Sequence, residues 1–208
     1  LYELITLFFV VLLFIRNFAP KLKNNFNMAL VILAHPHFDQ SIANKAIIEE
    51  LSRSDIDFEI RNLSALYPTF QIDVKAEQEA LLKHQEVIFQ YPFYWYNMPA
   101  ILKHWFDEVF TYQFAYGSQG DKLKGKYFIP SFTVGAPESE YHTLGEHHFK
   151  VYEFCKNLAQ TAYYAQMKYV EPLYFHGTSV NAGYTKEDIE AKAKAQAQRL
   201  LAFLSSLK

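Results

Sequence analysis

Cysteine is almost absent from the sequence, which contains only Cys155. A single thiol excludes an internal disulfide framework and a cysteine-based zinc site, and it is typical of a protein from a reducing compartment. Glycine is scarce as well, with 7 residues in a chain of 208. The loop after the first predicted strand contains no glycine, which excludes a GxGxxG dinucleotide turn and a P-loop there. No GxSxG motif follows any predicted strand, so a serine hydrolase of that type is also excluded.

The chain has little excess charge of either sign. Lys and Arg number 20 against 22 Asp and Glu, which gives a net charge of −2. A balance so close to neutral gives no sign of a surface for nucleic acid or another polyanion.

Aromatic residues, in contrast, are abundant. The chain has 15 Tyr, 19 Phe and 2 Trp. This exceeds what the core of one small domain needs, so some of them are expected to line a ligand site or a subunit interface.

Residues 1–27 are interpreted as an N-terminal extension outside the fold. Leu4–Ile15 is almost unbroken apolar sequence that ends at Arg16. It is too short for a comfortable membrane span, and it lacks the basic region that precedes the apolar core of a signal peptide. If it did insert, its basic flank would keep the rest of the chain on the cytoplasmic side of the inner membrane. We expect one domain over 28–208, beginning at Met28 and located in the cytoplasm.

From Met28 onward, short apolar runs alternate with amphipathic stretches. Continuous apolar runs predict buried strands, and apolar residues at helical spacing predict helices between them. The predicted strands are Ala29–Ala34, Phe58–Leu63, Val87–Tyr91, Tyr127–Val134 and Tyr169–Phe175. The predicted helices are Ser41–Arg53, Asp73–His84, Pro99–Phe110, His148–Tyr164 and a closing helix from Thr185 to about Leu207. This alternation indicates an α/β fold with a five-stranded parallel sheet of order 2-1-3-4-5, and ligand sites in such sheets lie at the carboxyl ends of the strands.

The loop after the first strand is a candidate phosphate site. Ser41 is a suitable N-cap, and the backbone N–H groups of Ile42, Ala43 and Asn44 would point back toward the loop. His35 would add a further donor. The alternative interpretation is a capped helix with a surface histidine.

The loop after the third strand is a candidate site for a planar ring. Phe93, Tyr94, Trp95 and Tyr96 are consecutive, and successive side chains point in opposite directions, so they cannot all enter one core. The alternative is a dimer contact, because aromatic residues also mark subunit interfaces.

The loop after the fourth strand contains Thr133, Val134, Gly135 and Ala136. Gly135 would let a ligand approach the backbone closely. Tyr141 and His147 lie downstream, and their side chains could donate hydrogen bonds to negative charge on a reduced ring. The alternative is a surface turn with no role in binding.

The histidines of this segment also suggest a metal site. His142, His147 and His148 lie close in sequence, but no carboxylate or cysteine stands at a recognised ligand spacing such as HExxH. We therefore expect no metal.

Several motifs resemble the flavodoxin-like NAD(P)H:quinone reductases, and the resemblance runs from Met28 to the C-terminus. The most specific is the string Pro92-x-x-Trp95-Tyr96-x-x-Pro99-Ala100-x-x-Lys103-x-Trp105-x-Asp107-x-Val109-Phe110. The others are Ala34-His35-Pro36, Ser41-x-x-Asn44, Ala115-Tyr116-Gly117 and Thr133-x-Gly135. Within this family the chain is most similar to the ancillary reductase subunit of glutathione-gated potassium efflux systems, which Leu66-Tyr67-Pro68 and Glu77-Gln78-Glu79-Ala80-Leu81 also resemble.

The resemblance implies a flavodoxin-like three-layer sandwich and a homodimer with one flavin per subunit. NAD(P)H would be the hydride donor, and quinones or similar electrophiles the acceptors. It implies FMN in preference to FAD, with the phosphate at His35 and Ser41–Asn44 and the ring against Phe93–Tyr96 and Thr133–Ala136. The spacing of Tyr141 and His147 matches a Tyr–His pair that assists hydride transfer in larger quinone reductases. The chain departs from the family at Val134 and at Ala136-Pro137, where Thr and a glycine pair are usual.

Two other functions compete with a reductase. One is a regulatory subunit docked on a potassium efflux transporter, with incidental catalysis. The other is a small electron carrier, which the nearly neutral charge disfavours because such carriers are usually strongly acidic.

Overall fold

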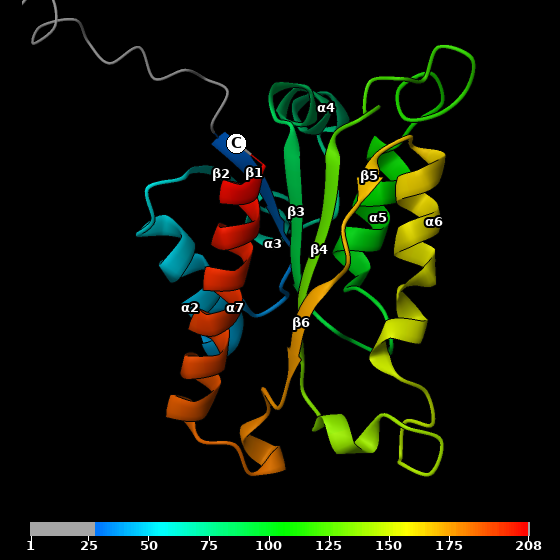
Figure 1. Ribbon diagram of the computed structural model, residues 1–208. Coiled ribbons are helices and arrows are strands. Elements are labelled where there is room, and N and C mark those ends of the chain that lie inside the picture. Colours follow the sequence, from blue (N-terminus) through cyan, green and yellow to red (C-terminus); the bar gives the residue numbers. More distant parts are fainter. Residues whose placement is uncertain (1–27, 208) are drawn as a thin grey trace, which may run out of the picture.

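The computed structural model describes residues 28–207, and the predictions made for residues 1–27 lie outside this range. A parallel sheet forms the centre of the molecule (Figure 1). Its strands are β1 (Met28–Leu33), β2 (Asp57–Asn62), β3 (Glu86–Pro92), β4 (Tyr127–Val134), β5 (Lys168–Tyr169) and β6 (Leu173–His176). The order is β2-β1-β3-β4-β5, with β6 also paired to β4, so the predicted order is confirmed.

The last predicted strand, Tyr169–Phe175, is not continuous. It is split into β5 and β6, which pair with successive parts of β4, so the sheet of the described chain has 6 strands where five were predicted. Pro172 lies between them and has no N–H to donate to the ladder, which explains the interruption.

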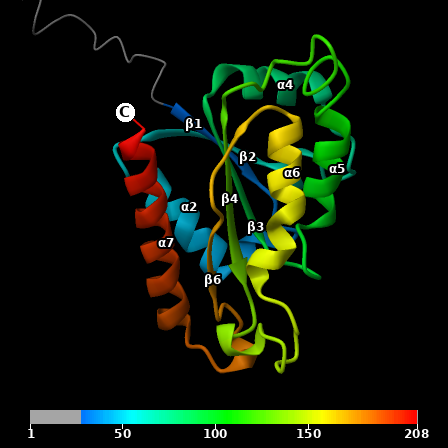
Figure 2. The same cartoon turned by 45° about the vertical axis from the view of Figure 1, so that its right-hand side comes forward.

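Helices cover both faces of the sheet (Figures 1 and 2). On one face lie α2 (Ile42–Ser52) and α7 (Lys186–Ser206), which pack side by side. On the other lie α3 (Leu63–Leu66), α4 (Val74–Lys83), α5 (Ala100–Val109) and α6 (Lys156–Tyr164). The three-layer arrangement is therefore as predicted.

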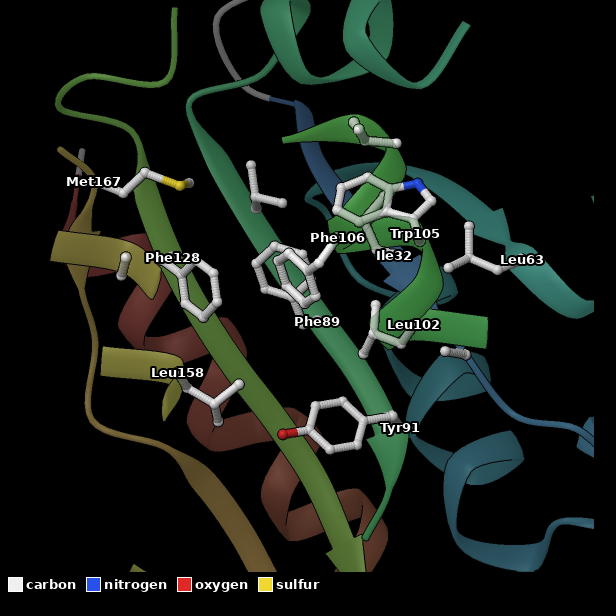
Figure 3. Packing of buried hydrophobic residues seen from close by; sticks show 14 of the residues in the cluster. Ile32, Leu63, Phe89, Tyr91, Leu102, Trp105, Phe106, Phe128, Leu158 and Met167 are labelled. Carbon is white, nitrogen blue, oxygen red and sulfur yellow. The ribbon is translucent and has the colours of Figure 1, made fainter. Parts of the chain in front are cut away.

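The core on the α4–α6 face contains a group of packed aromatic rings among aliphatic side chains (Figure 3). The Phe89 ring lies 4.4 Å from that of Phe128 and 4.9 Å from that of Phe106, measured between centroids. Trp105 is fully buried beside them. Much of the aromatic excess in the sequence is thus used in the core.

The helix predicted over His148–Tyr164 begins later. A short 3-10 helix, Val151–Cys155, leads into α6 at Lys156. His148 has a φ of 55°, in the left-handed region, so a helix cannot begin there. The one-turn helix α3 was not predicted, because Leu63–Leu66 is too short to show helical periodicity.

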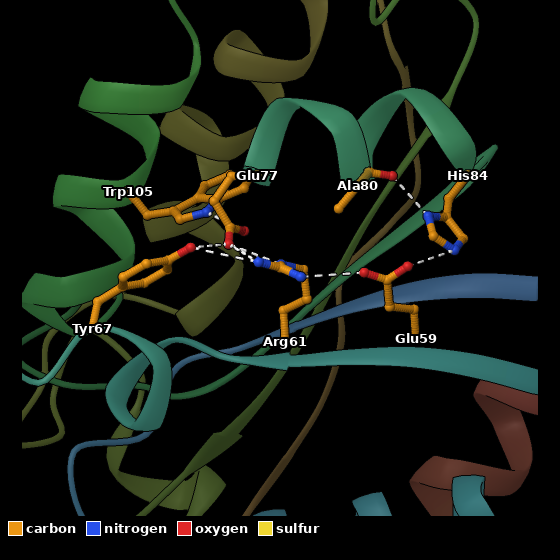
Figure 4. A network of polar contacts seen from close by, with 7 residues as sticks. All are labelled: Glu59, Arg61, Tyr67, Glu77, Ala80, His84 and Trp105. Carbon is orange, nitrogen blue, oxygen red and sulfur yellow. Dashed lines mark hydrogen bonds and ion pairs between the residues drawn. The ribbon is translucent and has the colours of Figure 1, made fainter. Parts of the chain in front are cut away.

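A buried carboxylate ties the helices of this face to the sheet (Figure 4). Glu77 of α4 accepts hydrogen bonds from the Arg61 guanidinium at 2.5 Å, from the Tyr67 hydroxyl at 2.5 Å and from Trp105 Nε1 at 2.9 Å. Its side chain is fully buried. Hydrogen bonding to Glu77 raises the pKa of Arg61, so the guanidinium stays charged.

None of the helices among residues 28–207 is both long and apolar enough to cross a lipid bilayer.

Candidate functional site

A cavity of about 590 Å³ opens at the carboxyl ends of the strands. The loops predicted to converge there all contribute to its wall. The predicted residues that line it are His35, Ser41, Ile42, Ala43, Asn44, Phe93, Tyr94, Thr133 and Gly135. In Figure 1 this edge of the sheet faces downward, and the loops after β4 and β6 lie below it.

The start of α2 presents unpaired donors to this cavity. Ser41 has an extended backbone (φ −78°, ψ 120°), and its Oγ accepts the backbone N–H of Asn44 at 3.1 Å. The N–H groups of Ile42 and Ala43, in the first turn, have no acceptor within the helix. Together with the partial positive charge of a helix N-terminus, they make this end of the cavity suited to an anion.

His35 is buried in the cavity wall and is uncharged at neutral pH. Burial, with a smaller contribution from the neighbouring His37, lowers the pKa of His35 from 6.5 to about 4. Its Nδ1 accepts the backbone N–H of His37 at 3.1 Å, so the ring proton lies on Nε2. His35 is therefore available as a neutral donor.

The unfolding free energy of the ligand-free protein is expected to fall as the pH is lowered from 6.5 to about 4. In this window the unfolded chain protonates His35 and the folded chain does not, so stability present above pH 6.5 is lost, by up to roughly 3 kcal/mol at the lower end. His35→Asn should flatten this slope, and the same change at the exposed His142 should not. Urea unfolding at stepped pH measures it, and identical slopes in wild type and His35→Asn would contradict it.

The side chain of Asn44 points inward. Its Nδ2 donates to Thr133 Oγ1 at 3.0 Å, and its Oδ1 accepts from Gln90 Nε2 at 2.8 Å. Only 2% of Asn44 is exposed. It thus contacts the Thr133 side of the wall, and its amide is already fully used within the protein.

The aromatic loop after β3 separates into two parts. Phe93 and Tyr94 line the cavity, whereas Trp95 and Tyr96 do not, and 92% of Trp95 is exposed. Trp95 (φ 46°) and Tyr96 (φ 63°) form the centre of a tight turn closed by reciprocal backbone hydrogen bonds between Tyr94 and Asn97. Positive φ at both central positions is typical of a type I′ turn, which bulky residues adopt only with strain.

In the loop after β4, Gly135 faces the cavity and its neighbours do not. A Cβ added at Gly135 would have Ser179 Cβ, at 3.9 Å, as its only near neighbour, so glycine leaves open space there. Val134 is fully buried. The carbonyl oxygen of Ala136 accepts from the backbone N–H of Gly177 at 3.2 Å, which ties this loop to the one after β6.

Tyr141 and His147 lie together in the segment that follows β4. Their rings stack with centroids 4.1 Å apart, and the Tyr96 hydroxyl lies 3.2 Å from His147 Nδ1. Burial raises the pKa of Tyr141, with a smaller contribution from Tyr96, so its hydroxyl keeps its proton. Neither residue lines the cavity itself.

A closed circuit of ring contacts connects this pair to the wall. Successive centroids lie 4.1 to 6.0 Å apart along Phe93, Phe132, Tyr174, His176, Tyr141, His147, Tyr96, Phe154 and back to Phe93. Phe93 belongs to both the circuit and the cavity lining. Ring contacts thus join the loop after β3 to the segment after β4.

The sequence interpretation missed one side of the cavity. Thr178, Ser179, Val180 and Asn181, from the loop after β6, line it together with His37 and Gln40. The sequence does indicate this side of the cavity. Gly177-Thr178-Ser179 follows the last strand of the sheet, and the carboxyl ends of parallel strands share one edge.

Within residues 28–207 no group of three or more His, Cys, Asp or Glu side chains is arranged to hold a metal ion. His142 Nδ1 instead accepts the backbone N–H of Leu144 at 3.2 Å, and His148 Nδ1 lies 3.3 Å from the Thr143 carbonyl oxygen.

Known proteins share both the sequence pattern and the fold. A family model described as Flavodoxin-like fold matches residues 27–201. A protein of Bacillus subtilis named uncharacterized NAD(P)H oxidoreductase YrkL is 37% identical over 177 residues, which cover 85% of this chain and 97% of that protein. The glutathione-regulated potassium-efflux system ancillary protein KefF of Salmonella gallinarum is 39% identical over 177 residues, covering 85% of this chain and 97% of KefF.

A solved structure of general stress protein 14 from Treponema denticola, in complex with FMN, is also similar. It superposes with a TM-score of 0.77 at 35% sequence identity, over 87% of this chain and 99% of that one.

Proposed function

Because the chain belongs to the flavodoxin-like fold family, we propose that it is an NAD(P)H oxidoreductase that binds FMN in the cavity at the carboxyl ends of β1, β3 and β4. Its acceptor would be a quinone or a similar electrophile, reduced by two electrons at once. The similarity to YrkL supports the activity, and the FMN complex of the T. denticola protein supports the cofactor.

The observation that carries the proposal is the set of donors at the start of α2. Residues His35 and Ser41–Ala43 all line the cavity. They offer the N–H groups of Ile42 and Ala43, the Ser41 hydroxyl and the Nε2–H of His35 as donors. A phosphate monoester has only acceptor oxygens and is held well by such a set. These residues fit the phosphate of FMN.

The remaining wall fits a planar ring. Phe93 and Tyr94 supply aromatic surface, and Gly135 leaves room for close approach to the backbone. When bound, FMN would supply the chemistry, by accepting a hydride from NAD(P)H and passing two electrons to an acceptor. The protein's part would be to orient both molecules, and to place Tyr141 and His147 as donors to the negative charge that develops at the ring.

The purified protein should be yellow and should carry about one FMN per chain, since one anion-binding helix start and one aromatic wall meet in one cavity. Heat release of the chromophore followed by chromatography identifies it and distinguishes FMN from FAD. A colourless protein that takes up neither added flavin would contradict the proposed function.

Tyr141→Phe and His147→Ala should each slow the reduction of the FMN-loaded protein by NAD(P)H roughly tenfold or more, the usual effect of losing one donor to developing charge. FMN affinity should change little, because the negative charge that these donors would stabilise develops only when the ring is reduced. Anaerobic stopped-flow absorbance measures the rate, with His142→Ala as the control. If both variants are reduced at the wild-type rate, the two residues have no role in flavin reduction and serve only the structure of the loop.

A second function is favoured by the similarity to KefF. We infer that the protein also serves as an ancillary subunit of a potassium efflux transporter, with the reductase site as its own activity. Co-purification with such a transporter tests this, and unchanged efflux in its absence would contradict it.

We further infer that the protein is a homodimer. Tyr112, Tyr163 and Tyr164 are largely exposed on the α5–α6 side, where Phe110, Tyr116 and Tyr164 line an apolar cavity of about 350 Å³. Exposed aromatic surface of this kind is typical of subunit contacts. Light scattering at micromolar concentration distinguishes dimer from monomer.

A further inference from the structure

A buried series of hydrogen bonds runs along the α2–α7 face of the sheet, from α7 toward the cavity. Gln196 donates from Nε2 to Ser131 Oγ at 3.0 Å, and Ser131 Oγ donates to Gln90 Oε1 at 2.6 Å. Gln90 donates in turn from Nε2 to Asn44 Oδ1 at 2.8 Å. Each of these side chains is at most 2% exposed. We call this series the amide relay.

The amide relay ends at two hydroxyl groups of the cavity wall. Asn44 Nδ2 donates to Thr133 Oγ1 at 3.0 Å and to Ser41 Oγ at 3.3 Å. Both hydroxyl oxygens are thus used as acceptors by a donor on the inner side. Each hydroxyl has one hydrogen left to donate, and both residues line the cavity.

The far end of the relay sets the orientation of Gln196, and the acceptor that the Ser131 hydrogen needs then sets the orientation of Gln90. Gln196 Nε2 lies 3.4 Å from the carbonyl oxygen of Phe132, a group that can only accept. The NH2 group of Gln196 must therefore face Phe132 and Ser131. Ser131 then has its hydrogen free for Gln90 Oε1, and the NH2 group of Gln90 is turned toward Asn44.

The near end is compatible with the same direction. Ser41 Oγ accepts the backbone N–H of Asn44 at 3.1 Å and Asn44 Nδ2 at 3.3 Å, so it can take both donors. Among the described residues, Gln196 Oε1 has no hydrogen-bond partner, and it is at the end remote from the cavity. An unpaired buried acceptor is destabilising, so the fold keeps this orientation at a cost.

The relay occupies positions where apolar side chains would otherwise be expected. Gln90 and Ser131 are partners in the β3–β4 register. They lie on the face that carries Ile88 and Ile129 two residues earlier along the strands. Only toward the carboxyl ends does this face become polar. The polar residues are therefore confined to the part of the sheet that leads to the cavity.

We infer that Gln90, Ser131 and Gln196 are positioning residues that hold the Thr133 and Ser41 hydroxyls as hydrogen-bond donors toward the cavity. Two hydroxyls held as donors favour a group that can only accept, above all a doubly charged phosphate monoester. They contribute less to a neutral hydroxyl end. This role rests on the proposed FMN site, and it explains how the site would distinguish FMN from riboflavin.

The test uses two variants that leave every cavity-lining side chain in place. Gln90→Leu removes the middle of the amide relay, and Gln196→Leu removes its remote end. Ile88→Val is the matched control, since it alters the same buried face beside Gln90 without touching the relay. Each protein is titrated with FMN and with riboflavin by flavin fluorescence, and with inorganic phosphate as a competitor. Circular dichroism checks folding.

Gln90→Leu should weaken FMN about tenfold or more, which is the size expected for a lost hydrogen bond to a charged group. Gln196→Leu should weaken FMN by a smaller factor. Riboflavin affinity should change little in either variant, and Ile88→Val should alter neither ligand. If Gln90→Leu does not fold, the FMN and riboflavin affinities of Gln196→Leu alone still test the inference. Gln196 lies farther from the cavity, so its replacement changes the site only through the relay.

Equal weakening of both flavins would show that the relay is only structural, and unchanged FMN affinity would show that it is not needed; either result overturns the inference. The proposed function fails separately, if the wild-type protein binds neither flavin. A wild-type preference for FMN that survives in both variants would leave the function standing and remove the inference alone.

Discussion

Ser41→Ala combined with Asn44→Asp is expected to weaken FMN binding by about a thousandfold or more, which corresponds to about 4 kcal/mol. Ser41 caps α2 and supplies one of the hydroxyl donors. An aspartate at position 44 can accept from Gln90 as asparagine does, but it can no longer donate to Thr133, whose hydroxyl would turn inward. It also places a second negative charge near the phosphate in a largely buried site, which is strongly unfavourable.

Riboflavin is the matched ligand for this experiment, because it lacks the phosphate. Its affinity should change far less than that of FMN, as measured by fluorescence titration. Asn157→Asp is the matched variant, since it makes the same change at an exposed position of α6 that does not line the cavity. Equal loss of both flavins in the double variant would show that the start of α2 does not hold the phosphate.

Glu77→Ala is expected to lower the unfolding free energy by about 3–5 kcal/mol, the usual effect of removing one partner of a buried ion pair. The loss would leave the partly buried Arg61 guanidinium, the Tyr67 hydroxyl and Trp105 Nε1 without their shared acceptor (Figure 4). Since domains of this size are stable by only about 5–15 kcal/mol, this one change would remove a large part of the total.

Urea unfolding at neutral pH, followed by circular dichroism, measures the effect. Glu79→Ala is the control, because Glu79 lies on the exposed side of the same helix, α4. Glu77→Gln keeps the shape of the side chain and one acceptor oxygen. Its unfolding free energy should therefore lie between those of Glu77→Ala and Glu79→Ala. If the urea concentration at the unfolding midpoint were the same for Glu77→Ala and Glu79→Ala, the Glu77 carboxylate would not stabilise the fold.

The order of the sheet was predictable because each strand carries its own signal. A run such as Ala29–Ala34 is apolar on both faces, and amphipathic helices separate the strands. The interrupted last strand was less predictable, since Pro172 blocks the ladder while the residues around it remain strand-like. The left-handed backbone of His148 had no signal at all, because it depends on hydrogen bonds of the surrounding loop.

The site was predictable to the level of its loops. His35, Ser41, Phe93 and Gly135 follow strands that end at one edge, and all of them line the cavity. The inward direction of Asn44 was not predictable, because it depends on Gln90, a residue 46 positions away in the sequence. The pattern of apolar residues in the sequence indicates which residues lie at one edge of the sheet. The direction of a side chain depends on contacts between strands that are distant in the sequence.

The two tryptophans stand in opposite environments, and this gives the protein two separate spectroscopic signals. Trp105 is fully buried and bonded to Glu77, whereas 92% of Trp95 is exposed on the turn beside the cavity. An indole in an apolar interior emits at shorter wavelength than one in water, so the two contributions to fluorescence can be separated. Emission from Trp95 would follow events at the turn, while emission from Trp105 would follow unfolding of the core. Binding and stability can thus be observed in one sample without an added label.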